Sequence, residues 1–219
     1  MSKQTTGFQE IAQSLACPQG VTGIEVAKEM NRTNRFISRK TYELLDLSNQ
    51  DRVLEIGLGN GAFVKEIIDA AQDIHFTGID ISETMIEEGK KINAHYIHSH
   101  QAELLLANVE KLPFKDQSFN KVCTVNTIYF WENPTNALQE IYRVLVKPGI
   151  FVIAFRPYVP GQSLDFSAYG FREYTIEEVK DLLSAHPWQI TQQKTEVEPP
   201  IWFQQKQYYL KSQYFVIKK

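Results

Sequence analysis

The chain has 219 residues, of which 43% are hydrophobic and 22% are charged, a balance typical of one globular domain. Its net charge of −3 and its two cysteines, Cys17 and Cys123, argue against an electrostatically driven nucleic-acid binder, a disulfide scaffold and a metal site. No apolar run approaches the roughly 18 residues of a membrane span, and the first ten residues lack the apolar core of a secretory signal. We therefore expect a cytoplasmic protein without a membrane span or a nucleic-acid partner.

Strand-like and helix-like segments alternate through most of the chain. In chain order, apolar periodicity predicts a strand at 52–56, a helix at 63–71, a strand at 74–80, a helix at 82–92, strands at 104–107 and 121–127, a helix at 133–145, a strand at 150–155 and a helix at 175–183. Ser82, Asn133 and Thr175 are residue types that cap helices. Residues 207–218 read as a strand with one exposed face, and residues 1–50 as two helices, 24–30 and 36–47.

Strands joined by helices form right-handed crossovers and a parallel sheet covered on both faces. The fold class we expect is α/β: a doubly wound, mainly parallel seven-stranded sheet with an antiparallel edge strand. The sequence suggests a single domain over 1–219, with an N-terminal helical cap (1–50), a core (51–155), and a lid and edge strands (156–219). The aromatic-rich stretch 156–174 is long enough for a lid.

The turn after the first predicted strand carries glycines at 57, 59 and 61. Glycine tolerates positive φ and lets the backbone approach a ligand, and in an open parallel sheet ligands bind beyond the carboxyl ends of the strands. Glu55 lies two residues earlier, on a strand that should be buried, where a carboxylate is costly unless loop N–H groups or a cation meet it. A pyrophosphate would be repelled there. The turn therefore favours a cationic or zwitterionic ligand over a dinucleotide.

Polar residues also end the next two predicted strands. Asp80 lies at the end of the second, the usual place for a carboxylate that accepts hydrogen bonds from two ribose hydroxyls. Asn108 follows the third, where its amide or a neighbouring backbone amide could meet an adenine edge. These positions suit a ligand that contains adenosine.

Four segments, at 54–61, 78–82, 108–114 and 138–149, resemble successive motifs of the class I S-adenosylmethionine (SAM)-dependent methyltransferases, in the family's order and at its spacing. The resemblance extends from about residue 51 to 155 and is nearest to the small-molecule branch that includes quinone-biosynthesis C-methyltransferases. Two positions depart from the pattern. Asn108 stands where the family usually has Asp, and Ile150 replaces the second glycine of a Pro-Gly-Gly turn.

The resemblance implies a Rossmann-like fold and an enzyme that transfers the methyl group of SAM to a small-molecule acceptor. Because alignment and desolvation dominate such a displacement, no catalytic residue is assigned. Two alternatives remain open, a SAM-binding module without turnover and a nicotinamide-dependent oxidoreductase. The resemblance places SAM, as cofactor, against the following residues: Glu55, Gly57, Leu58, Gly59, Asn60, Gly61, Asp80, Ile81, Met85, Asn108, Val109 and Asn126.

Several further polar residues have an unassigned role. Asn126 and Tyr129 have the Asn-x-x-Tyr spacing of amino-methyltransferases but lack that motif's prolines, so Asn126 is interpreted as bordering the methionyl end of SAM. Arg156 could pair with an anionic acceptor or face solvent, and the second is the default expectation. Thr33 and Asn34 lie in a region that resembling enzymes use to cover the site; they could reach it or could serve as ordinary helix caps. The three histidines at 95, 98 and 100 are read as surface residues, and neither the acceptor nor the oligomeric state can be assigned.

Overall fold

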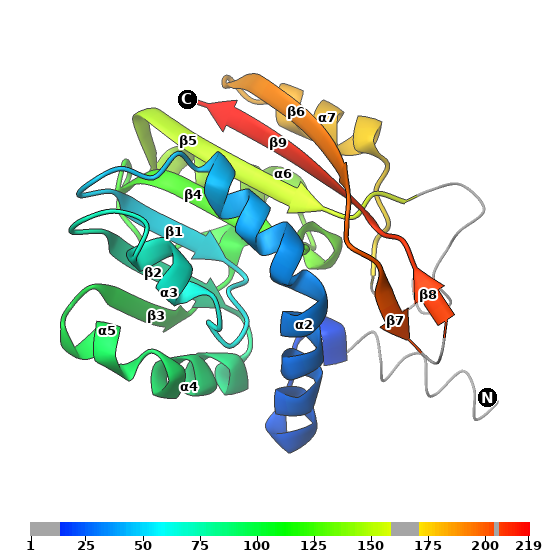
Figure 1. Ribbon diagram of the computed structural model, residues 1–219. Helices are drawn as coiled ribbons and strands as arrows, with labels where there is room; N and C mark the ends of the chain where they lie inside the picture. The colour runs from blue at the N-terminus through cyan, green and yellow to red at the C-terminus, as the bar shows by residue number, and fades with distance from the viewer. Residues whose placement is uncertain (1–13, 159–170, 204–205) are drawn as a thin grey trace.

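The computed structural model describes residues 14–158, 171–203 and 206–219 (Figure 1). Their main sheet has the strand order β3-β2-β1-β4-β5-β9-β6, and β9 runs antiparallel to both of its neighbours while the other strands are parallel. The predicted seven-stranded α/β sheet, with antiparallel pairing at one edge, is confirmed. The strands are β1 (Arg52–Ile56), β2 (His75–Asp80), β3 (Ala102–Leu106), β4 (Phe119–Val125), β5 (Leu145–Phe155), β6 (Gln189–Val197) and β9 (Lys211–Lys218), with β7 (Ile201–Phe203) and β8 (Lys206–Tyr208) in a separate hairpin.

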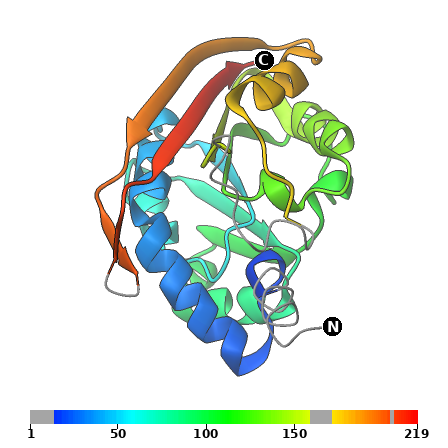
Figure 2. The same ribbon diagram turned by 90° about the vertical axis from the view of Figure 1, so that its right-hand side faces the viewer.

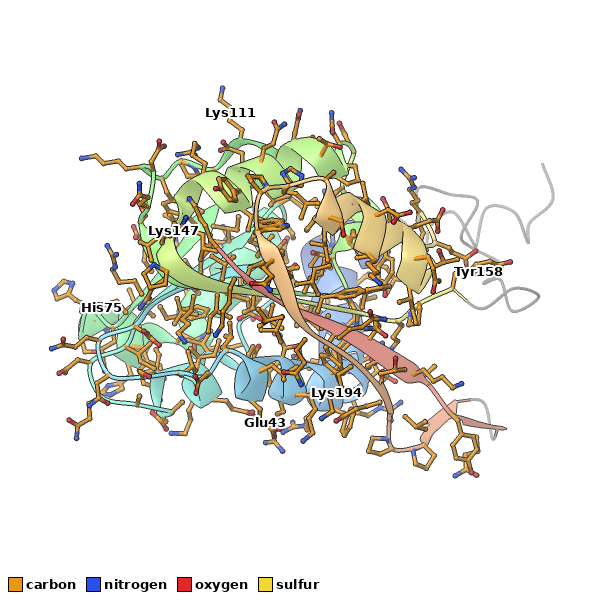
Figure 3. All side chains as sticks on the ribbon, turned by 90° about the horizontal axis from the view of Figure 1, so that it is seen from above. Glu43, His75, Lys111, Lys147, Tyr158 and Lys194 are labelled. Atoms are coloured by element: carbon orange, nitrogen blue, oxygen red, sulfur yellow. The ribbon has the colours of Figure 1, made fainter. Side chains whose placement is uncertain are left out.

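Helices cover both faces of the sheet. The helices are α2 (Gly20–Leu44), α3 (Val64–Ile68), α4 (Glu83–Ile92), α5 (Ala94–His98), α6 (Pro134–Val144) and α7 (Ile176–Ser184), with 3₁₀ turns η1 (Val109–Lys111) and η2 (Ile128–Phe130). One buried cluster lies beneath α6 and α7, and a second lies between the sheet and α2, α3 and α4. Figure 3 shows this layering. His75, the first residue of β2, and Tyr158, beyond the end of β5, lie at opposite ends of the sheet.

Local side-chain chemistry fixes the helix starts as the sequence predicts. The Ser82 hydroxyl accepts a hydrogen bond from the Met85 N–H, and Asn133 Oδ1 accepts one from the Asn136 N–H at 3.1 Å. Thr175 and Glu178 form the reciprocal capping box. Each of these caps satisfies an N–H group that has no partner within the helix.

Helix α2 differs from the expectation. The sequence predicts two helices over residues 1–50, but Gly20–Leu44 form one helix, which changes direction near its middle in Figure 1. Its C-terminal half packs on the sheet through buried residues that include Ile37 and Tyr42. Its N-terminal half extends beyond the carboxyl ends of the strands. The two-helix prediction is wrong because the polar segment 31–35 continues the helix instead of interrupting it.

Strand β9 is also buried more fully than expected. Its residues from Ser212 to Ile217 are all buried, so the predicted exposed face is absent. The reason is β6, which the sequence analysis did not predict because its central residues are polar and exposed. The single strand predicted at 207–218 is two strands in the structure, the end of β8 and the whole of β9. No helix among the described residues has the length and apolar character required to cross a membrane.

Candidate functional site

A cavity lies at the carboxyl ends of the central strands, bounded by the loops after β1, β2, β3 and β4 and by α2. Figure 2 looks onto these strand ends, with α2 running along one side of them. Strand order reverses between β1 and β4, because the chain proceeds from β1 to β2 on one side and crosses to β4 on the other. Open α/β sheets bind ligands at this switch point. Eleven of the twelve predicted site residues line the cavity, and Gly61 does not.

The loop after β1 has a backbone that only glycine adopts readily. Gly57 and Gly59 have φ values of +72° and +60°. A Cβ at Gly57 would lie 2.3 Å from the Thr127 side chain, so the loop packs tightly against the segment after β4. A Cβ at Gly59 would meet nothing within 4 Å, which leaves space on the cavity side. Gly61 instead packs against Asn93, whose Nδ2 donates to the Gly61 carbonyl at 3.0 Å.

Glu55 is buried on the cavity wall beside α2. The Tyr42 hydroxyl donates to Glu55 Oε1 at 2.8 Å, in place of the loop N–H group or cation that the sequence analysis anticipated. Burial raises the pKa of Glu55 to about 7; the Tyr42 hydrogen bond lowers it and the nearby Asp80 charge raises it. The ionised carboxylate is therefore destabilised here and would be stabilised by a cation.

Asp80 is the second buried carboxylate of the cavity. Its Oδ2 accepts from the Gly59 N–H at 2.9 Å, and its Oδ1 accepts from the Ser82 N–H at the same distance. Asp80 thereby fixes the glycine loop against the start of α4. Burial nevertheless raises its pKa to about 6, against the lowering effect of these backbone hydrogen bonds. Asn108, at the neighbouring strand end, accepts from the Glu110 N–H at 2.8 Å and caps η1.

A polar network links the other side of the cavity to the sheet edge. Arg156 makes a two-point ion pair with Glu198, with Nε–Oε1 and Nη2–Oε2 distances of 2.7 and 2.9 Å. Its Nη1 donates to Asn34 Oδ1 at 3.0 Å and its Nη2 to the Thr33 carbonyl at 2.8 Å. The expectation that Arg156 faces solvent is wrong, because its partner Glu198 has a side chain only 1% exposed. The network holds the middle of α2.

Asn126 joins this network from the loop after β4. It has a φ of +55°, and its Nδ2 donates to Asn34 Oδ1 at 3.1 Å. The Tyr129 hydroxyl lies 3.0 Å from Asn126 Oδ1 and accepts from the Arg156 N–H at 2.6 Å. Phe171 stacks on Tyr129 at a centroid separation of 4.5 Å. The aromatic rings after β4 thus support the wall on which Asn126 lies.

Helix α2 contributes cavity residues that the site prediction did not include. Asn31, Asn34 and Ser38 line the cavity, and Asn31 Nδ2 donates to Asn60 Oδ1 at 3.0 Å. The available signal was their spacing, because small polar residues three and four positions apart share one helix face. Further residues that line the cavity were not assigned because they come from separate loops: Leu15, Ala16, Pro18, Phe63, Glu110, Thr127, Phe130, Trp131 and Glu132.

The segment before α2 is attached beside the cavity. The Ser82 hydroxyl donates to the Pro18 carbonyl, and the Gly20 N–H donates to Thr84 Oγ1 at 3.1 Å. Both contacts join this segment to the start of α4. The three histidines are exposed on or after α5, as predicted. The central part of the predicted lid, 159–170, lies outside the described residues.

The sequence is similar to proteins that carry methyltransferase names. A family model described as a methyltransferase domain matches residues 54–153. The YrhH protein of Bacillus subtilis (strain 168), which is named for this family, is 31% identical over 123 residues, covering 56% of this chain and 67% of the relative. A demethylmenaquinone methyltransferase of Listeria welshimeri is 27% identical over 157 residues, 66% of each chain. The YcgJ protein of Bacillus subtilis shares the fold, with a TM-score of 0.63 at 17% identity, over 85% of this chain and 97% of that one.

Proposed function

Since the chain belongs to the class I SAM-dependent methyltransferases, we propose that the cavity beyond β1 and β4 binds SAM together with its small-molecule acceptor. SAM supplies a methyl group on a positively charged sulfur, already activated for displacement by a nucleophile. The work left to the residues is therefore to bind both molecules, align them and exclude water, which can lower such a barrier by about 7–11 kcal/mol.

The observation that carries this proposal is a pair of buried carboxylates on one cavity wall without a cationic partner among the described residues. Glu55 has one hydrogen bond, from Tyr42, and Asp80 has backbone N–H partners only. A ligand with a positive charge and hydroxyl donors would compensate the cost of burying them. The open space at Gly59 admits such a ligand next to the loop backbone. These features fit SAM and do not fit a pyrophosphate.

Each end of the cavity then has a distinct role. Asp80 accepts hydrogen bonds from the ribose hydroxyls while its existing N–H partners hold it in place. Asn108 and the backbone of Val109 contact the adenine, and Glu55 faces the cationic end of the cofactor. Asn126 lies nearest the acceptor side, through its contact with Asn34. Helix α2 and the segment at Pro18 cover the cavity and exclude water.

The remaining assignments form part of the same proposal. Residues 1–219 act as one domain, with 1–50 as a cap, 51–155 as the cofactor-binding core, and 156–219 as a lid and edge strands. Both cysteines are free, which favours a cytoplasmic location. The acceptor is a small molecule instead of a nucleic acid, because the net charge is −3.

Titration calorimetry with S-adenosylhomocysteine, followed by methyl transfer from SAM, tests the function. We expect Asp80→Asn to weaken cofactor binding by about 10–100-fold, because charge-assisted hydrogen bonds are lost. Asp181→Asn, an exposed change on α7, is the matched control and leaves binding unchanged. Thermal unfolding verifies that both variants fold. Tight NADH binding, or no binding of the nucleoside by the wild type, refutes the proposal.

A further inference from the structure

The described cavity wall contains acidic residues and no basic ones. Its four charged members are Glu55, Asp80, Glu110 and Glu132, and no Lys, Arg or His of the described chain lines it. Glu132 is exposed at the wall and has no hydrogen bond or ion pair with another described residue. SAM brings one net positive charge, which does not neutralise this set. When these carboxyl groups are ionised, the cavity with SAM bound therefore keeps a net negative charge.

Two arginines of the described chain are tied to residues of the wall: Arg35 lies over the Phe63 ring, 5.7 Å from its centroid, and Arg156 is hydrogen-bonded to Asn34. The charge of Arg156 is already compensated. Glu198 takes its Nε and Nη2, and the Ser212 hydroxyl donates to Glu198 Oε1 at 2.5 Å. The remaining Nη1 donates to Asn34. A guanidinium paired at two points with a buried carboxylate contributes little net charge to its surroundings. Arg156 is therefore not available to receive a carboxylate or phosphate of an acceptor.

The same network fixes which way the Asn34 amide points. Arg156 and the Asn126 Nδ2 group are both donors, so the Asn34 atom that meets them at 3.0 and 3.1 Å is its oxygen. The Asn34 Nδ2 group then lies on the other branch of the amide. It has no hydrogen bond to any described residue, and Asn34 lines the cavity. A residue of the cavity wall thus carries two N–H donors without a partner among the described residues, on an amide that cannot rotate without losing two bonds.

On the basis of the proposed function, we infer that the acceptor is an uncharged or cationic small molecule that accepts a hydrogen bond from Asn34 Nδ2. An anionic acceptor enters a cavity whose charged wall residues are all acidic and whose wall contains no Lys, Arg or His of the described chain. A neutral oxygen or nitrogen lone pair finds the Asn34 donors instead. Phe130 on the same wall offers an aromatic surface for the rest of the molecule. Arg156 and Glu198 are positioning residues, since they act on the acceptor only by orienting Asn34.

Two sets of matched compounds test the charge requirement: tryptophol, tryptamine and indole-3-acetate, and 3,4-dihydroxybenzyl alcohol, 3,4-dihydroxybenzylamine and 3,4-dihydroxybenzoate. Their dissociation constants are measured on the full chain saturated with S-adenosylhomocysteine. We expect the alcohol or the amine of at least one set to bind at least about tenfold more tightly than its carboxylate. Equal or tighter binding of the carboxylates, or no binding by any member, overturns the inference. Saturation with S-adenosylhomocysteine is verified first, so that a failure of the proposed cofactor site is distinguished from a failure of the inference about the acceptor.

Two variants test the residues themselves. Asn34→Asp keeps the oxygen that Arg156 and Asn126 contact but replaces the donor group with an acceptor. We expect about tenfold weaker binding of the alcohol, with the affinity for S-adenosylhomocysteine within about twofold of wild type. Asn136→Asp, at an exposed position of α6, makes the same chemical change away from the cavity and is the control. Unchanged alcohol binding in Asn34→Asp excludes the assigned hydrogen bond.

Glu132→Gln provides an independent test of the charge argument. Removing this carboxylate should narrow the preference for the alcohol over the carboxylate by about threefold or more, without weakening the alcohol. Glu103→Gln removes an exposed carboxylate from β3, which does not line the cavity, and should leave the preference unchanged. An identical effect of both variants shows that the discrimination comes from the overall charge of the protein, which contradicts the inference.

Discussion

The glycine loop allows the cost of backbone strain to be separated from the cost of a side-chain collision. Two of its glycines have the same kind of backbone strain, but an added side chain would collide at only one of them. Gly57 and Gly59 both have positive φ, so an alanine at either position costs about 1–2 kcal/mol. Only at Gly57 does the new Cβ collide, 2.3 Å from Thr127 Cγ2, and such overpacking costs a further 1–3 kcal/mol or so. We expect Gly57→Ala to lower the free energy of unfolding by about 2–5 kcal/mol and Gly59→Ala by about 1–2 kcal/mol.

The colliding atom also suggests a rescue. Thr127→Ser removes Cγ2 and keeps the hydroxyl that contacts the Thr124 hydroxyl. In the double variant Gly57→Ala/Thr127→Ser, the backbone strain, the loss of one methyl group and a 3.3 Å contact with the Cβ atom of residue 127 remain. A double-mutant cycle should therefore give a favourable coupling of about 1–3 kcal/mol.

Urea unfolding at several protein concentrations measures all four free energies. Gly59→Ala combined with Thr127→Ser is the control cycle, and its coupling should be close to zero because nothing lies within 4 Å of the added Cβ. If Gly57→Ala is no less stable than Gly59→Ala, or if Thr127→Ser fails to restore it, then the contact between the two loops does not constrain the glycine. The reasoning from loop packing would then be wrong.

Three further outcomes follow from the buried charges. The pKa of Glu55 is raised to about 7, so if the cationic cofactor binds the ionised form, SAM affinity should rise about tenfold from pH 6 to 7.5, and calorimetry should find a smaller rise in Glu55→Gln. The same raised pKa stabilises the folded state below the unfolded pKa of 4.5, and this stabilisation is lost as the pH rises through 7. Between pH 5 and 8, the free energy of unfolding of Glu55→Gln, measured in urea, should therefore rise by up to about 3 kcal/mol relative to that of the wild type. Arg156→Met leaves Glu198 buried without its cation and should cost about 3–5 kcal/mol, part of which Arg156→Met/Glu198→Leu should recover in the same assay.

Features set by short-range chemistry were predictable from the sequence. The caps at Ser82, Asn133 and Thr175 depend on residues at most three positions away, and the strand–turn–helix at the glycine loop is similarly local. The parallel order of the core strands follows from their alternation with helices. These rules also placed Glu55 and Asp80 at one edge of the sheet, because the carboxyl ends of parallel strands meet there.

The α2 side of the cavity could not be predicted in the same way. Asn34 meets Arg156 across 122 positions of the chain, and Arg156 meets Glu198 across a further 42. No local pattern encodes such pairings. Strand β6 was missed for a related reason: its exposed polar residues lack alternation, and it is ordered by pairing with the buried strand β9. The default expectation of a solvated arginine failed because the partner lies in a segment that periodicity did not assign.

Helix α2 connects the two ends of the site. Tyr42, in its packed half, holds Glu55 at the cofactor end, while Asn34, nearer its middle, lies at the acceptor end. Eight positions separate these residues, which is about 12 Å along a helix. Because the residues between them form continuous helix, a shift of α2 moves both Tyr42, the partner of Glu55, and Asn34, the donor to the acceptor. The Arg156–Glu198 ion pair, which bonds to the backbone at Thr33 as well as to Asn34, therefore fixes the register of the whole helix against the sheet. Its loss should weaken acceptor binding first, since Asn34 is its direct contact, and cofactor binding only through the movement of Tyr42.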